Sequence, residues 1–290
     1  MQYRTDLAVE VDALLAEARQ QAQGYIKKQS QIDEDISVTE IKITTEEGER
    51  TFGKPRGTYT TLEVEGVLEE KNDIIMRAAR ALAAELKKLI KFDYFLKVLV
   101  VGLGNEKVTP DSLGPHTVDK VKITSHLFKI FECDGDWEMA NVSGFNPSVT
   151  GVTGMETAEL IERAVSLVKP DVVIAVDSLA AKDMSRMSTT IQVCDTGIAP
   201  GAGMGNNRKE INEAGLGCRV IAIGVPTVID SRTLLMEAAE EIKDWDVEEY
   251  IRQKELDMIV TSTDIDQIIK NFSEIIANAI NITLHPGIYS

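Results

Sequence analysis

Three aliphatic runs of strand type, separated by segments of helical periodicity, constrain the fold of this chain more than any other feature. The runs cover residues 97–101, 171–176 and 217–225. Continuous apolar runs of this length are typical of strands that are buried on both faces of a parallel sheet. Helical segments are predicted between the runs. The sequence therefore favours an α/β fold, with a mainly parallel twisted sheet and helices on both faces.

The amino-terminal part of the chain carries different patterns. Residues 7–28 have a three-four apolar spacing that predicts an amphipathic helix, with Thr5 or Asp6 as its N-cap. Residues 36–45 and 58–65 alternate and flank a segment rich in glycine, which predicts an antiparallel hairpin with a long loop. No repeat or composition break divides the chain, so we expect one domain that carries the helix and hairpin as an elaboration.

Further elements are expected along the rest of the chain. Helices are predicted over about 71–90, 112–129, 151–168, 231–243 and 264–278, and strands near 138–144 and 189–194. Residues 197–205 contain four glycines and a proline, which predicts a long flexible loop.

Composition limits the classes of function. The 290 residues carry a net charge of −16, which disfavours direct nucleic-acid binding because that needs a basic face; a solvated acidic surface is the simpler interpretation. No signal peptide and no apolar stretch long enough for a bilayer is present, so we expect a cytoplasmic protein without membrane contact. The three cysteines form no CxxC pair, which disfavours a disulfide framework or a zinc site.

Two aspartates follow two of the predicted strands. Asp111 lies in the loop after residues 97–101, and Asp177 directly follows residues 171–176. Carboxyl ends of parallel strands form the usual ligand-binding edge of an α/β sheet. Two carboxyl groups brought together cannot both ionise easily, so one could activate water while the other protonates a substrate amide. The alternative is that each aspartate caps a helical turn, and spacing alone leaves both interpretations open.

Other motifs fail or are weak. Gly102 and Gly104 follow a strand, but the third glycine of a dinucleotide fingerprint is replaced by Lys107. Neither a phosphate-binding GxxxxGK[ST] loop nor a GxSxG nucleophile elbow is present. No HExxH zinc motif occurs, and His116 is the one histidine close in sequence to the candidate site.

Six blocks of sequence closely resemble the spore germination proteases of endospore-forming bacteria, in the same order and over nearly the whole chain. The blocks are YRTDLAVE at 3–10, VGLGN with TPDSLGP at 101–115, GVTGMET at 151–157, VDSLA at 176–180, DTGIAPGAG at 195–203 and GVPTVID at 224–230.

The resemblance implies both a fold and an activity. The fold would be of phosphorylase/hydrolase type, similar to that of hydrogenase maturation endopeptidases. The activity would be that of an atypical aspartic endopeptidase of the spore core, without a cofactor or metal, which degrades small acid-soluble DNA-binding spore proteins at germination. The resemblance assigns the catalytic aspartates to Asp111 and Asp177.

The resemblance also implies a self-processing zymogen that forms a homotetramer. Cleavage is expected between Asp6 and Leu7, which leaves residues 1–6 as a short propeptide and 7–290 as the peptidase domain. If Asp6 caps the first helix, the bond would lie at a helix start, and the first turn would have to fray before cleavage. Thr153, Gly154 and Glu156 are candidates for binding substrate or an oxyanion, because they stand near a predicted helix N-terminus.

Two other functions remain open from the residues. A metal-dependent peptidase of the maturation type would use the same two carboxylates with His116 or Glu156 as ligands. A non-catalytic protein could use its acidic surface to bind basic clients.

Overall fold

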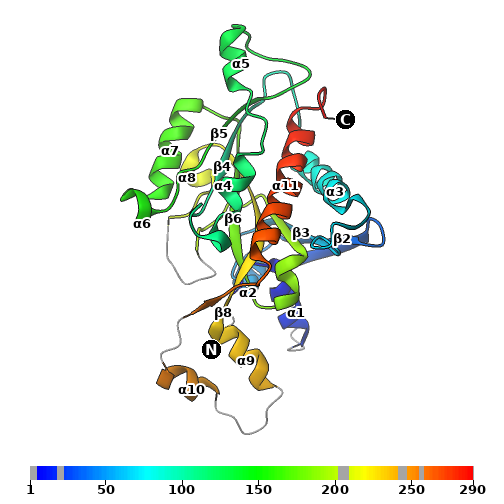
Figure 1. Ribbon diagram of the computed structural model, residues 1–290, viewed down its shortest axis with the longest axis vertical. Coiled ribbons are helices and arrows are strands. Elements are labelled where there is room, and N and C mark those ends of the chain that lie inside the picture. Colours follow the sequence, from blue (N-terminus) through cyan, green and yellow to red (C-terminus); the bar gives the residue numbers. More distant parts are fainter. Residues whose placement is uncertain (1–4, 18–22, 202–208, 241–246, 255–257, 290) are drawn as a thin grey trace.

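A single mixed sheet organises the computed structural model in Figure 1. The structure describes every residue except 1–4, 18–22, 202–208, 241–246, 255–257 and 290. Within this part the strands are β1 (Tyr25–Gln31), β2 (Ile36–Ile43), β3 (Gly57–Val64), β4 (Lys97–Gly102), β5 (Asn141–Phe145), β6 (Val172–Ala181), β7 (Thr190–Cys194), β8 (Arg219–Asp230) and β9 (Ile259–Val260). Their order across the sheet is β1-β2-β3-β7-β8-β6-β4-β5, and β9 pairs with β8.

The predicted α/β class is confirmed, but the sheet is mixed rather than mainly parallel. Strands β8, β6, β4 and β5 pair in parallel, whereas β1, β2, β3, β7 and β9 join the sheet through antiparallel pairs. The predicted hairpin is present as β2 and β3, and β3 pairs with β7. Because β7 also pairs with β8, the hairpin extends the central sheet.

Helices cover both faces of this sheet. They are α1 (Ala8–Glu17), α2 (Glu46–Phe52), α3 (Ile74–Leu89), α4 (Leu113–Val118), α5 (Ser125–Ile130), α6 (Thr150–Thr153), α7 (Thr157–Val168), α8 (Glu213–Leu216), α9 (Ser231–Glu240), α10 (Val247–Lys254) and α11 (Ile265–Leu284). Short 3₁₀ turns occur at Lys71–Asp73, Thr109–Asp111 and Met184–Ser188. None of the helices in the described part combines the length and apolar character that crossing a bilayer requires.

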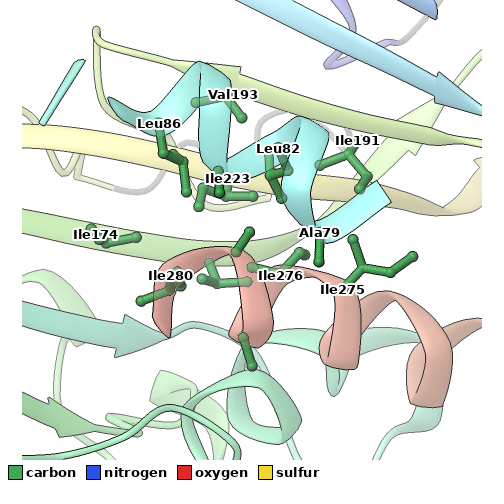
Figure 2. Close-up of a cluster of buried hydrophobic side chains, with 14 of the residues drawn as sticks. Ala79, Leu82, Leu86, Ile174, Ile191, Val193, Ile223, Ile275, Ile276 and Ile280 are labelled. Atoms are coloured by element: carbon green, nitrogen blue, oxygen red, sulfur yellow. The ribbon is translucent and has the colours of Figure 1, made fainter. Parts of the chain in front are cut away.

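The largest hydrophobic core lies under α3 and α11, which run side by side in Figure 1. Figure 2 shows Leu82 and Leu86 of α3 and Ile276 of α11 directed toward the strands, where Ile174, Ile191 and Ile223 meet them. These side chains are all nearly or completely buried. Since each strand presents alternate residues to this core, the intervening residues face the opposite side of the sheet.

That opposite side is covered in two separate places. Val173 and Ala175 of β6 belong to a cluster with residues of α7, while Leu179 belongs to a second cluster with residues of α1 and α2. Asp177 shares their face by alternation and falls between the two clusters. A carboxylate is thereby placed at the boundary between two apolar layers.

Several predicted element boundaries differ in the structure. The expected helix over 7–28 is α1, which ends at Glu17, followed by β1; residues 18–22 lie outside the described part. The expected helix over 112–129 is two short helices, α4 and α5, and the helix over 151–168 begins as α6 and continues as α7. The end of the expected helix over 231–243 also lies outside the described residues. Strand β6 continues past Asp177 to Ala181, because β8 extends equally far and pairs with it.

A buried histidine is the C-cap residue of α11. The His285 side chain has no exposed surface; its Nε2 donates to the main-chain oxygen of Lys122 at 3.0 Å, and its Nδ1 has no hydrogen-bond partner among the described residues. Burial lowers the pKa of His285. A proton added at Nδ1 would find no acceptor, so the neutral ring is the form that the fold accommodates.

We therefore expect acid to destabilise the protein through His285. The unfolded chain takes up this proton below about pH 6.5, where the folded chain resists it, so the stabilising contribution is complete above that pH and is lost as the pH falls. His285→Gln removes the titration, and its melting temperature should fall less between about pH 7.5 and 5.5 than that of the unmodified protein. His126→Gln, at an exposed position, is the control and should behave like the parent. Equal losses in parent and His285→Gln would contradict the expectation.

Candidate active site

One cavity brings together the two aspartates singled out in the sequence. It has a volume of about 400 Å³, and its wall includes Asp111, Asp177, Asp6 and Thr227. Asp177 is almost fully buried, at 5% exposure, while Asp111 is half-buried. Two aspartates from distant parts of the chain therefore line the same space.

Asp111 is held by the turn that follows β4. Its carboxylate oxygen Oδ2 accepts from the amide of Asn105 at 2.9 Å, and its main-chain oxygen accepts from the same amide. Gly104 has φ of +105°, and a Cβ at this position would lie 2.0 Å from the Asp111 main-chain oxygen. The Thr227 hydroxyl donates to the oxygen of Pro110 at 2.7 Å and fastens the turn to β8. Local backbone contacts thus set the position of Asp111.

Asp177 is placed by the sheet itself. It lies within β6, opposite Gly224 of β8, and one carboxylate oxygen accepts from the amide of Ser178 at 2.9 Å. The end of β4 reaches the same level, because the Leu103 amide donates to the oxygen of Val176 at 2.8 Å. Asp177 is therefore part of a strand, whereas the sequence predicted that it follows one.

A second cavity of about 250 Å³ adjoins the first. Asp6, Asp177 and Ser178 line both, and the second cavity is also lined by Lys54, Tyr59 and Gln192. Burial lowers the pKa of Lys54, an effect that the charges of Asp6 and Glu10 oppose. Burial also raises the pKa of Tyr59. Asp6, Asp177 and Glu210 also line the second cavity, so carboxyl-bearing residues line both cavities and the second adds the ammonium of Lys54.

The segment around Asp6 and Leu7 lies in this site and is not helical. The Asp6 amide donates to the oxygen of Ala180 at 2.9 Å, and the Asp6 carboxylate accepts from the Ala180 amide at 2.9 Å. Thr5, not Asp6, accepts from the amide of Leu7, and α1 begins only at Ala8. The expected fraying of the helix is therefore unnecessary, because the bond between Asp6 and Leu7 precedes α1.

The other predicted site residues lie farther out. Gly154 ends α6 in the left-handed region and Glu156 is the N-cap residue of α7, but neither they nor Thr153 line the two cavities. Their neighbours Ser148, Val149 and Thr157 line the first cavity instead. That Thr153, Gly154 and Glu156 bind substrate or an oxyanion stays a prediction. Within the predicted loop, residues 197–201 border the cavities, and 202–205 lie outside the described residues.

The structure also bears on the alternative ligand set. His116 lies half-buried on α4 and lines neither cavity. In the part of the chain that is described, no group of three or more His, Cys, Asp or Glu side chains is arranged to hold a metal ion. Cys194 is buried in β7 and Cys133 and Cys218 are half-buried, all three as free thiols.

Sequence reasoning missed Lys54 and Gln192. Lys54 follows a turn glycine in a loop and gives no signal of its own. Gln192 is a buried polar residue within the apolar strand β7, and an amide in that setting needs hydrogen-bond partners. An amide between two aliphatic residues of a strand was therefore the signal that could have identified Gln192.

Comparison with known proteins points to one family. A model of the family described as germination protease matches residues 4–243. The germination protease of Caldanaerobacter subterraneus subsp. tengcongensis is 40% identical, with 98% of this chain and 95% of the relative covered. That of Clostridium perfringens is 37% identical over the same shares. That of Oceanobacillus iheyensis is 43% identical, with 83% of this chain and 68% of the relative covered.

Proposed function

The chain belongs to the germination protease family, and on this premise we propose that it is the endopeptidase that initiates degradation of small acid-soluble spore proteins during germination. The substrates would be DNA-binding proteins with a basic surface. The net charge of −16 would attract such substrates electrostatically. The compartment would be the spore core.

The observation that carries the catalytic part of this proposal is the shared cavity lined by Asp111 and Asp177. Two carboxyl groups that share one cavity, one of them on an almost fully buried residue, favour a state in which one is ionised and the other protonated. The ionised group takes a proton from water, and the protonated group donates to the leaving amide nitrogen. We do not divide these roles between the two residues, because a coupled pair titrates as a unit. The enzyme would be an atypical aspartic peptidase that needs no cofactor.

Self-processing is the second part of the proposal. Asp6 lines the same cavity as the two aspartates, which supports cleavage of the bond between Asp6 and Leu7. Residues 1–6 would then be a propeptide and residues 7–290 a single peptidase domain, made as a zymogen and assembled as a homotetramer. A likeness in fold to hydrogenase maturation endopeptidases remains part of this proposal.

Incubation of the purified full chain with one small acid-soluble spore protein tests the function. We expect fragments cut between an acidic and an apolar residue, mapped by mass spectrometry, and a new amino terminus at Leu7 of the enzyme. The matched control is the same client with the apolar residue after the cut replaced by Asp, which should stay intact at that position. Binding without fragments would instead favour a non-catalytic acidic binding protein. Loss of turnover in chelator, restored by a divalent cation, would favour a metal-dependent peptidase.

A further inference from the structure

Two side chains donate hydrogen bonds to one main-chain oxygen in the candidate site. The oxygen belongs to Asp6; Lys54 Nζ lies 2.8 Å from it and Gln192 Nε2 lies 3.0 Å from it. Lys54 comes from the turn after α2, and Gln192 comes from β7. Two convergent donors on a single carbonyl oxygen, at 2.7–3.1 Å or so, are the arrangement that stabilises an oxyanion in amide hydrolysis.

The same glutamine also holds the far side of the peptide bond. Its Oε1 accepts from the amide of Ala8 at 2.8 Å, so one side chain spans the link between Asp6 and Leu7. The Leu7 side chain is completely buried in a cluster that includes Tyr59, Leu179 and Cys194. On the other side, the Asp6 amide and carboxylate are bound to the main chain of Ala180. The carbonyl group is therefore fixed in direction as well as in place.

The two cavities meet at this bond. Asp6 and Asp177 line both, while Asp111 lines the first alone and Lys54 and Gln192 line the second alone. Water activated by the carboxyl pair would reach the carbonyl carbon from the first cavity. The oxygen of the same carbonyl points to the donors in the second.

This inference rests on the proposed function. We propose that Lys54 and Gln192 are catalytic residues that bind the oxyanion formed when the bond between Asp6 and Leu7, or the equivalent bond of a client, is hydrolysed. The water oxygen bonds to the carbonyl carbon as one proton passes to the ionised carboxylate, and the C=O electron pair moves onto the oxygen facing the donors. When that pair returns, the C–N bond breaks and the Leu7 nitrogen takes a proton from the protonated carboxyl group.

The partly desolvated ammonium of Lys54, a half-buried residue, explains why this interaction favours the transition state over the ground state. Burial lowers the pKa of Lys54, so its charge is poorly solvated. In the ground state its donor bond reaches a neutral carbonyl oxygen. As negative charge develops on that oxygen, the attraction between it and the ammonium grows, because desolvation of Lys54 leaves its charge less screened than in bulk water. Differential binding of this kind accelerates the chemical step.

Lys54→Met and Gln192→Glu test the assignment through the rate constant of self-processing, followed by mass spectrometry of the new amino terminus. Methionine keeps the length of the lysine stem but cannot donate. Glutamate keeps the acceptor for Ala8 and loses the donor to Asp6. Each change should slow processing by about 10²–10³-fold, the usual effect of one oxyanion donor. The melting temperature of Lys54→Met should be equal to or above that of the parent, because a partly desolvated ammonium is removed.

Matched controls separate this role from general effects of the substitutions. Desolvation also lowers the pKa of Lys120, and its Nζ donates to the oxygen of Lys270 at 3.0 Å, away from the site. Lys120→Met and Gln267→Glu should process at the parental rate. A parent that neither processes itself nor cuts clients would overturn the proposed function. A parent that does both, with Lys54→Met and Gln192→Glu equally fast, would overturn only the assignment of the two donors. Slower processing joined to a matching fall in melting temperature would also overturn it, in favour of a structural role.

Discussion

Replacement of Asp177 by Asn should lower the turnover number on a small acid-soluble spore protein by about 10²–10⁴-fold, the range that positioned acid–base groups contribute. Asp111→Asn should have an effect of the same order. The amide has the size of the carboxyl group, so client binding should be preserved. Because the two groups act as a unit, the double variant should be little worse than either single one.

The measurement is the initial rate of client cleavage, with client affinity determined separately by a binding assay. Asp266→Asn, an exposed position on α11, is the control and should keep the parental rate. Circular dichroism must show that the variants are folded, since Asp177 is buried. If either variant still cuts its client at the parental rate, the carboxyl pair is not the catalyst. If binding and turnover both survive the two changes, the cavity is not the active site.

Replacement of Gly104 by Ala should damage the site without touching either carboxyl group. The new Cβ would lie 2.0 Å from the main-chain oxygen of Asp111 and 3.0 Å from its Oδ1, in a backbone conformation with φ of +105°. The turn must move, and Asp111 must move with it. We expect a loss of activity of about 10²-fold, the cost of misplacing a catalytic group by about 1 Å. The free energy of unfolding should fall by about 1–3 kcal/mol.

Gly217→Ala provides a matched control for the backbone strain. Gly217 has φ of +71°, and a Cβ there meets no atom within 4 Å. Its substitution should cost about 1 kcal/mol of stability and leave the turnover number unchanged. Denaturant unfolding and client cleavage, measured on both variants, separate strain from displacement. Parental activity in Gly104→Ala would mean that the turn does not set the position of Asp111.

The sequence predicted where the strands that carry the site lie, but it did not predict how all the strands pair in the sheet. Aliphatic runs identified β4, β6 and β8, because strands buried on both faces leave a clear pattern. The same runs could not predict that β7 would enter antiparallel between β3 and β8, since pairing direction depends on contacts between distant segments. β1, with six of its seven residues exposed, has none of the alternation that marks a half-buried strand.

The sequence predicted those site residues that combine a reactive side chain with a position at or near a strand end. Asp111 and Asp177 stand at or near strand ends, and the resemblance named both. Lys54 and Gln192 are far from them in sequence and from each other, so only the folded chain brings the two donors onto one oxygen. Asp177 lies within β6 and not after it. A sequence pattern alone does not distinguish an acidic residue inside a buried strand from one that ends it.

The residues that line the two cavities come partly from strands and partly from turns. Asp177 and Gln192 are built into adjoining regions of the sheet framework, whereas Asp111 and Lys54 are supplied by turns. Groups on strands are held more accurately than groups on turns, and turns tolerate change more readily. Substitutions that change substrate specificity should therefore accumulate in the turns. The positions of the site residues on the strands should differ little between relatives.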